Sequence, residues 1–218
     1  MKKAALHNLG CKVNAYETEA MQHLLEEAGY EIVPFTQKAD VYVINTCSVT
    51  NMADRKSRQM LHKAKKNNPD SIVVAAGCYV QTSEKEVLND LSVDIVIGND
   101  RKHDLVRLLE EYSLDSVSDT VDDINDGKHD FEELFIDQTK EHTRAFIKVQ
   151  DGCNQFCSYC IIPYARGRVR SRRFENVIAE VERLAANGFK EVVLTGIHLS
   201  SYGVDFEEAT GPVSYTHL

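Results

Sequence analysis

Short apolar runs alternate with amphipathic stretches along residues 1–112. Five of the runs have the length of buried strands, and they occupy residues 3–9, 31–35, 40–45, 71–77 and 94–98. The run at 31–35 contains a proline, which favours an edge position because proline donates no hydrogen bond to a neighbouring strand. Helical periodicity fills the intervals between the runs. The pattern therefore predicts parallel strands connected by helices.

Start and stop signals of helices agree with this interpretation. Asn14, followed three residues later by Glu17, resembles a capping box for a helix that ends at Gly29. A second helical stretch over 52–67 ends shortly before Pro69. We therefore predict an α/β domain with a doubly wound parallel sheet of the flavodoxin-like type.

The periodicity stops at residue 112, where we place the end of the N-terminal domain. Residues 113–142 are rich in Asp and Ser and predict an acidic, loosely packed linker. A strand, a loop with cysteines, a helix and a second strand then follow, which predicts the beginning of a (β/α) barrel over 143–207. Residues 208–218 depart from this pattern, and we interpret them as a cloning or sequencing artefact.

The net charge of −9 for 218 residues argues at first against a nucleic-acid partner. Residues 112–142 alone contribute −8, with ten acidic side chains against two lysines, so the rest is nearly neutral and can carry local basic faces. The sequence has no apolar run of the roughly 18 residues that a membrane helix needs. Its start lacks the apolar segment of a signal peptide. A cytoplasmic protein with no membrane partner is expected.

Three of the six cysteines stand just after the ends of predicted strands: Cys11 in NLGC, Cys47 in INTC and Cys78 in AAGC. Ligands of doubly wound sheets bind at the carboxyl ends of strands, so we expect these thiols to share one edge of the sheet. Gly10 and Gly77 beside them let the backbone approach a bulky inorganic group. Three unrelated buried cysteines are the alternative. Thiolate-only ligation favours zinc or an iron–sulfur cluster, and zinc normally takes a fourth protein ligand.

The other three cysteines are clustered with the spacing C-x3-C-x2-C, at Cys153, Cys157 and Cys160. A zinc ribbon or finger needs a second ligand pair, and none follows Cys160. A thioredoxin-like interpretation of CSYC leaves Cys153 unexplained. Three thiolates can hold three irons of a [4Fe–4S] cube. The fourth iron is then open to a small molecule.

The motif CNQFCSYC, with Tyr159 before its last cysteine, resembles the signature of the radical S-adenosylmethionine (SAM) superfamily. The resemblance implies that the open iron binds the amino and carboxylate groups of SAM. It implies that an electron from the cluster splits the sulfonium into methionine and a 5′-deoxyadenosyl radical. It also implies that Tyr159 lies beside the adenine, and that Thr195 and Gly196 contact the amino acid part of SAM. Gly196 as a simple turn residue is the alternative, and no catalytic residue beyond the clusters is expected.

The two cysteine sets, together with IIPYARGRVRSR, resemble the methylthiotransferases from residue 3 to about residue 205. The resemblance implies a second [4Fe–4S] cluster on Cys11, Cys47 and Cys78. The stretches GCKVN, NTCSVTN and GCYVQT resemble the corresponding stretches of the methylthiotransferases that act on threonylcarbamoyladenosine at position 37 of tRNA.

Other readings remain open: the branches acting on isopentenyladenosine in tRNA or on a ribosomal-protein aspartate, and a non-catalytic iron–sulfur module that binds RNA. The resemblance further implies tRNA as a partner, an electron donor of the flavodoxin or ferredoxin type, and a monomer. Members of the family are about twice as long as this chain, so the expected activity concerns the full-length protein.

Five arginines crowd the stretch after the clustered cysteines: Arg166, Arg168, Arg170, Arg172 and Arg173. Such a run suits contacts with RNA phosphates, and we predict this role for all five. A solvated or salt-bridged face is one alternative. Another is that a guanidinium holds the SAM carboxylate.

Overall fold

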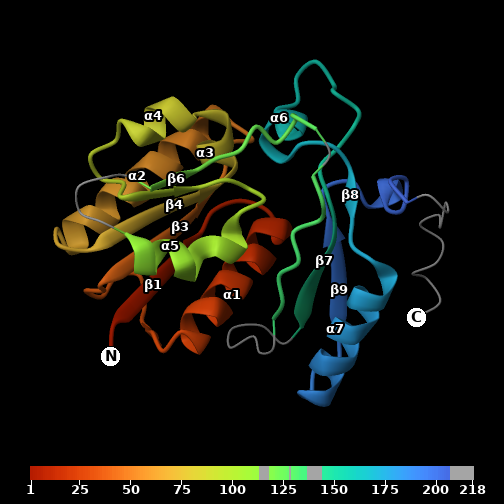
Figure 1. Ribbon diagram of the computed structural model, residues 1–218, viewed down its shortest axis with the longest axis horizontal. Coiled ribbons are helices and arrows are strands. Elements are labelled where there is room, and N and C mark those ends of the chain that lie inside the picture. The colour runs from red at the N-terminus through yellow and green to blue at the C-terminus, as the bar shows by residue number, and fades with distance from the viewer. Residues whose placement is uncertain (113–117, 128, 137–143, 207–218) are drawn as a thin grey trace.

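The computed structural model describes residues 1–112, 118–127, 129–136 and 144–206. Figure 1 shows two α/β units side by side, the N-terminal one on the left and the C-terminal one on the right. The predicted tail at 208–218 lies outside the described residues. So do residues 113–117, 128 and 137–142 of the predicted linker and residues 143 and 207 of the predicted barrel segment.

Six parallel strands form the first sheet in the order β2-β1-β3-β4-β5-β6. They are β1 (Lys3–Asn8), β2 (Glu31–Ile32), β3 (Val41–Thr46), β4 (Ile72–Gly77), β5 (Ile95–Ile97) and β6 (Ser118–Thr120). The order of the first five is that of a flavodoxin-like sheet, so the predicted fold class is confirmed. The proline-containing run forms the short β2 at the edge, as predicted.

Helices cover both faces of this sheet (Figure 1). They are α1 (Lys12–Glu27), α2 (Asn51–Asn67), α3 (Cys78–Thr82), α4 (Glu84–Leu88), the 3-10 turn η1 (Lys102–Asp104) and α5 (Leu105–Glu111). Successive residues of β3 point to opposite faces of the sheet. Tyr42 and Ile44 pack with α2, α3 and α4 on one face, and Val41 and Val43 pack with α1 and α5 on the other. A strand that is covered on both sides reads as one continuous apolar run.

The second unit contains β7 (Ala145–Asp151), β8 (Arg170–Ser171) and β9 (Val192–Gly196), in the order β8-β7-β9. β9 is parallel to β7, and α7 (Phe174–Ala186) connects them through a core that includes Ile147, Val177 and Leu184. This is the strand–helix–strand unit expected for the start of a (β/α) barrel. β8 pairs antiparallel with β7, and α6 (Ile162–Arg166) lies between the cysteine loop and β8. A further 3-10 turn, η2 (Leu199–Ser201), follows β9.

The described part of the predicted linker is packed rather than loose. β6 extends the first sheet, and Ile124, Leu134 and Ile136 are buried. Leu134 and Ile136 pack against Tyr16 and Ala20 of α1. The segment therefore fills the joint between the two units. The domain boundaries drawn from the sequence remain predictions.

The predicted capping box at the start of α1 is wrong. The helix begins at Lys12, its N-cap residue is Cys11, and no side chain caps it. Asn14 and Glu17 are instead buried, at 1% and 0% exposure. No described helix has both the length and the apolar character that a bilayer span requires.

Candidate metal centre and cofactor cavity

The first set of cysteines meets at one edge of the first sheet. β1, β3 and β4 are neighbours, and Cys47 and Cys78 each directly follow the last residue of a strand. Cys11 is three residues beyond the end of β1. All three line one cavity of about 550 Å³. The structure thus brings together the three thiols that the sequence predicts to share an edge.

Two glycines allow the backbone beside these thiols to pack closely. Gly10 has a φ of +113°, and a Cβ atom there would lie 3.0 Å from the sulfur of Cys47. Gly77 has a φ of +96°, and its Cβ would lie 2.5 Å from Oδ1 of Asn45. Both backbone conformations strongly favour glycine. Any larger residue would crowd the wall that carries the cysteines.

The donors of this set are three cysteine thiols, which suit zinc or an iron–sulfur cluster. Among the described residues, no three His, Cys, Asp or Glu side chains are close enough to hold a metal ion. In an iron–sulfur cube each thiolate binds a different iron. Burial raises the pKa of the Cys47 thiol, and a bound metal is what overcomes such a penalty and favours the thiolate.

The opposite wall of the cavity comes from the second unit. Ile161 is the N-cap residue of α6, Ile162 is the first residue of this helix and Arg166 is its last. Thr195 and Gly196 belong to the end of β9. Two of the three residues expected to contact SAM, Thr195 and Gly196, therefore share a cavity with the first cysteine set, and their SAM contacts stay predictions.

The clustered cysteines lie in the loop between β7 and α6. Cys157 is exposed, while Cys153 and Cys160 are partly buried. The backbone N–H of Cys153 donates to the carbonyl of Gly167 (3.0 Å), and that of Cys160 donates to the carbonyl of Cys157 (2.9 Å). These bonds fold the three thiols into one short loop, as a three-thiolate cluster site requires.

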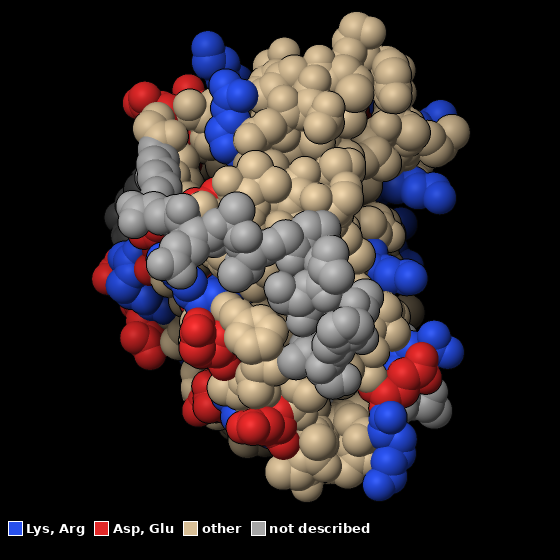
Figure 2. Space-filling view, turned by 90° about the vertical axis from the view of Figure 1, so that its right-hand side faces the viewer, with Lys and Arg blue, Asp and Glu red and all other residues tan. Residues whose placement is uncertain are grey.

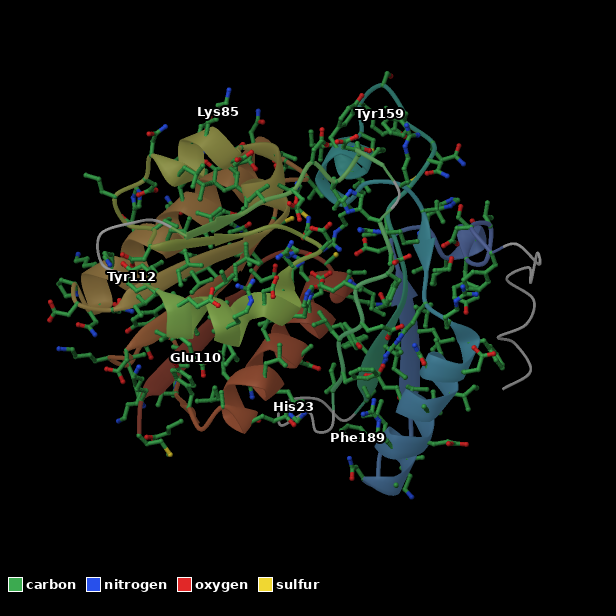
Figure 3. The ribbon with its side chains drawn as sticks, in the orientation of Figure 1. His23, Lys85, Glu110, Tyr112, Tyr159 and Phe189 are labelled. Atoms are coloured by element: carbon green, nitrogen blue, oxygen red, sulfur yellow. The ribbon has the colours of Figure 1, made fainter. Side chains whose placement is uncertain are left out.

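Aromatic residues of this loop are not directed at the cavity. Tyr159 is 91% exposed and lies at the outer end of the loop (Figure 3). Phe156, with φ at 46°, stacks edge-on with Tyr164 and receives the guanidinium of Arg168 at 4.4 Å from its ring centre. The position of Tyr159 beside an adenine stays a prediction.

The structure corrects the role of three arginines. Arg166, Arg170 and Arg172 are 1%, 5% and 0% exposed. Arg172 pairs with Glu133 and Glu180, and Arg166 with Glu17 and Asp151. The buried guanidinium groups of Arg166 and Arg172 are already paired with carboxylates, and that of Arg170 is buried and donates to the carbonyl of Arg166, so none of the three is placed to reach an RNA phosphate.

Arg168 and Arg173 are exposed and remain candidates for RNA contact. On the face seen in Figure 2, the described lysines and arginines lie along the margins, mixed with acidic side chains on the left and at the lower right and largely without them at the upper right.

Several buried polar residues at the site were missed from the sequence. Glu17, Asn14 and Asn99 come from the first unit, and Lys148 and Asp151 from β7. Burial opposes charge on Glu17, but the cations Arg166, Lys102 and Lys148 outweigh it and hold its pKa well below the ordinary value. Of these residues, Asn14 and Glu17 are noticeable in the sequence, but their spacing is also that of a helix capping box.

A flavodoxin-like sheet with three cysteines at its strand ends, joined to a β/α unit with a C-x3-C-x2-C loop, defines the class of radical SAM iron–sulfur proteins. Two family models match the chain: "Uncharacterized protein family UPF0004" over residues 3–98 and "Radical SAM superfamily" over residues 147–210. With the relatives described next, these matches show that both units of the chain are similar to the radical SAM methylthiotransferases.

Curated relatives cover nearly all of the chain. It is 46% identical over 213 residues to threonylcarbamoyladenosine tRNA methylthiotransferase MtaB of Bacillus subtilis (strain 168), which covers 95% of this chain and 46% of the relative. It is 35% identical over 215 residues to tRNA-2-methylthio-N(6)-dimethylallyladenosine synthase of Bacillus mycoides (strain KBAB4), covering 95% of this chain and 42% of the relative. The chain thus spans about half the length of the curated relatives it matches.

A solved structure supports the fold. The radical S-adenosylmethionine methyltransferase TsrM from Kitasatospora setae, with tryptophan substrate and a SAM analogue bound, superimposes with a TM-score of 0.59. The match covers 92% of this chain and 48% of TsrM, at 16% identity. At this identity the likeness concerns the arrangement of the two units only.

Proposed function

We propose that the full-length protein transfers a methylthio group to N6-threonylcarbamoyladenosine at position 37 of tRNA, by radical SAM chemistry with two [4Fe–4S] clusters. One observation carries this proposal: Cys11, Cys47 and Cys78 face Thr195 and Gly196 across a single cavity. A sulfur-delivery site and a SAM site must share such a space for one substrate carbon to meet both. The higher identity to the MtaB relative than to the dimethylallyladenosine synthase, 46% against 35%, favours this branch.

Each cysteine set has a distinct task in this scheme. Cys153, Cys157 and Cys160 hold one cluster, with Tyr159, Thr195 and Gly196 around SAM. Cys11, Cys47 and Cys78 hold the other. When bound, the clusters supply the electron that cleaves SAM and an iron site for the sulfur that is transferred.

The walls of the cavity suit a reaction that water would quench. Apolar side chains of both units line it, among them Val13, Val49, Ile161, Ile162 and Ile197. An apolar lining excludes water and so protects a reactive intermediate from side reactions. The chain's own contribution is therefore a space with apolar walls between two sites that it holds in a fixed relation.

The partners follow from the same proposal. Arg168 and Arg173 are exposed near the cysteine loop and would contact phosphates of the tRNA. A flavodoxin- or ferredoxin-type protein would deliver electrons, and the enzyme would act as a monomer. tRNA and such a reductant are both present in the cytoplasm, which we propose as its location.

The decisive test is nucleoside mass spectrometry of tRNA. Deleting the gene for the full-length protein should abolish the methylthio derivative of threonylcarbamoyladenosine, and a plasmid copy should restore it. Loss of the methylthio derivative of isopentenyladenosine instead would move the protein to the other tRNA branch. Unchanged tRNA in the deletion strain would refute the proposal.

Two triple variants of the full-length protein, reconstituted without oxygen, assign the cysteine sets. Cys153→Ala, Cys157→Ala and Cys160→Ala together should stop the release of 5′-deoxyadenosine from SAM. Cys11→Ala, Cys47→Ala and Cys78→Ala together should leave that release intact and abolish only methylthio transfer. Equal loss of both activities in the second variant would contradict separate tasks for the two sets.

A further inference from the structure

Arg166 joins the two units at the cavity. Its side chain is 1% exposed although it belongs to α6, directly after the clustered-cysteine loop. Nη1 donates to Oε1 of Glu17 at 2.9 Å and to Oδ2 of Asp151 at 3.0 Å. Nη2 donates to Oδ1 of Asn14 at 2.6 Å. One guanidinium therefore binds helix α1 of the first unit and the end of β7 in the second.

Two buried amides extend this contact to the first cysteine set. Oδ1 of Asn14, which accepts from Arg166, also accepts from the thiol of Cys11 at 3.6 Å. Nδ2 of Asn99 donates to the sulfur of Cys78 at 3.6 Å and to the carbonyl of Ala165 at 2.6 Å. Cys11 is thus linked to α6 through the side chain of Asn14, and Cys78 through that of Asn99.

The network has more positive than negative charge. Lys102, Lys148, Arg166 and Arg170 all lie within 3.9 Å of the carboxylates of Glu17 or Asp151. Counting also Glu132, whose charge acts on Lys148, three carboxylates face four cations. Surplus charge away from water is costly unless an anion lies nearby. Cys11, Cys47 and Cys78 line the same cavity as Arg166, and as thiolate ligands of a bound cluster they would supply that anion.

We propose that Arg166 is a positioning residue with two effects: its guanidinium fork holds α6 against α1, and its charge favours the reduced state of a cluster on Cys11, Cys47 and Cys78. The second effect rests on the cluster assigned to those cysteines in the proposed function. A reduced cluster carries one more negative charge, so a nearby cation stabilises it and raises the reduction potential. The first effect needs no cluster.

Lysine and glutamine at position 166 separate the two effects. Arg166→Lys keeps the charge but loses the fork that binds two partners at once. Arg166→Gln loses both. In the full-length protein without metal, hydrogen exchange of the α1 and α6 amides should quicken in both variants. Arg107→Gln, an exposed arginine of α5, is the control with the same change in net charge, and it should leave that exchange unchanged.

The potential is measured in full-length protein that also carries Cys153→Ala, Cys157→Ala and Cys160→Ala, so that only the first set can hold a cluster. A chemical reductant supplies one electron per cluster, and electron paramagnetic resonance follows the reduced form. Arg166→Gln should shift the midpoint potential to more negative values, while Arg166→Lys and Arg107→Gln should stay near the parent. Glu17→Gln removes a negative charge instead and should shift the potential in the opposite direction.

The outcomes are distinct. Opposite shifts in Arg166→Gln and Glu17→Gln support the electrostatic effect, and equal potentials in a loaded protein overturn it. If Arg166→Gln does not fold, Glu17→Gln and Arg166→Lys still decide. Unchanged hydrogen exchange in both Arg166 variants overturns the docking effect. If the parent protein binds no iron at this set, the cluster assignment of the proposed function fails, while the docking effect is judged by exchange alone.

Discussion

At the scale of the residue, glycines decide how closely the clustered-cysteine loop approaches β8. Gly152 stands directly before Cys153 with a φ of +69°. A Cβ atom there would lie 1.9 Å from the carbonyl oxygen of Arg168, which is backbone and cannot swing away. The close approach allows the hydrogen bond from Cys153 to Gly167 that closes the loop. Gly152 therefore positions a proposed ligand without touching the metal.

The substitution Gly152→Ala tests this. Gly188 is the matched control, because its φ of +92° is similar but an added Cβ would meet nothing within 4 Å. Gly188→Ala should cost about 1–2 kcal/mol of stability, the strain of a left-handed alanine. Gly152→Ala should cost more in urea denaturation and should lower the iron bound by the clustered set in the full-length protein. Equal costs for the two variants would contradict the packing argument.

At the scale of the element, the long strands and helices of the first unit were predictable from the sequence. β1, β3, β4 and α2 form near the expected positions, because a continuous apolar run and an amphipathic period are local signals. β6 was missed because three polar residues inside an acidic stretch carry no strand pattern. Its pairing with β5 is set by the tertiary structure.

The candidate site likewise has one part that the sequence predicts and one part that it does not. The convergence of the first cysteine set followed from local strand ends plus the topology of a parallel sheet. The burial of Arg166, Arg170 and Arg172 did not, since a charged run in sequence carries no sign of the carboxylates that it meets. Those partners, such as Glu17 and Asp151, come from distant segments.

The 3-10 turn η1 carries a pH-sensitive contact with the segment that follows β6. Nδ1 of His103 lies 3.2 Å from Oε1 of Glu132, which also accepts the backbone N–H of His103 at 3.0 Å. The hydrogen bond with Glu132 raises the pKa of His103 above its ordinary value of 6.5, against the opposing effect of burial. A raised pKa means that the folded state binds the proton more tightly than the unfolded state does.

The stabilisation from His103 should therefore be complete below the ordinary pKa and should disappear as the pH rises through the raised one. Because the side chain is 51% exposed, the gain should be at most about 1 kcal/mol. His103→Gln should thus lose stability at low pH and almost none at high pH, as measured by urea denaturation. NMR titration should show the raised pKa of His103 returning towards 6.5 in Glu132→Gln. A difference in stability that grows with pH would contradict the assignment.

At the scale of the whole molecule, α1 is shared by both units (Figure 1). One side of it carries Met21 and Leu25 into the core of the first sheet. Another side carries Tyr16 and Ala20 against Leu134 of the connecting segment. The hydroxyl of Tyr16 also donates to the carbonyl of Leu134 at 2.5 Å. A helix held from both sides fixes the relation between the two cysteine sets.

If this joint holds the two units together, truncating its apolar side chains should weaken the contact between the units. Leu134→Ala removes a side chain that is 3% exposed and keeps the backbone carbonyl that Tyr16 binds, so it should cost about 2–5 kcal/mol in urea denaturation. Phe135→Ala is the neighbouring control, because Phe135 is 40% exposed and stacks with Arg172 and Arg183. It should cost about 1 kcal/mol or less.

Hydrogen exchange distinguishes a loosened joint from general destabilisation. In Leu134→Ala the amides of α1 and β7 should exchange faster under native conditions, while those of β3 and β4, deep in the first sheet, should keep their protection until global unfolding. This difference is expected because Leu134 contacts α1 from outside the first sheet. Uniform acceleration in every strand would mean that the two units unfold as one body. The relation between the cysteine sets would then depend on the stability of the whole fold rather than on this joint.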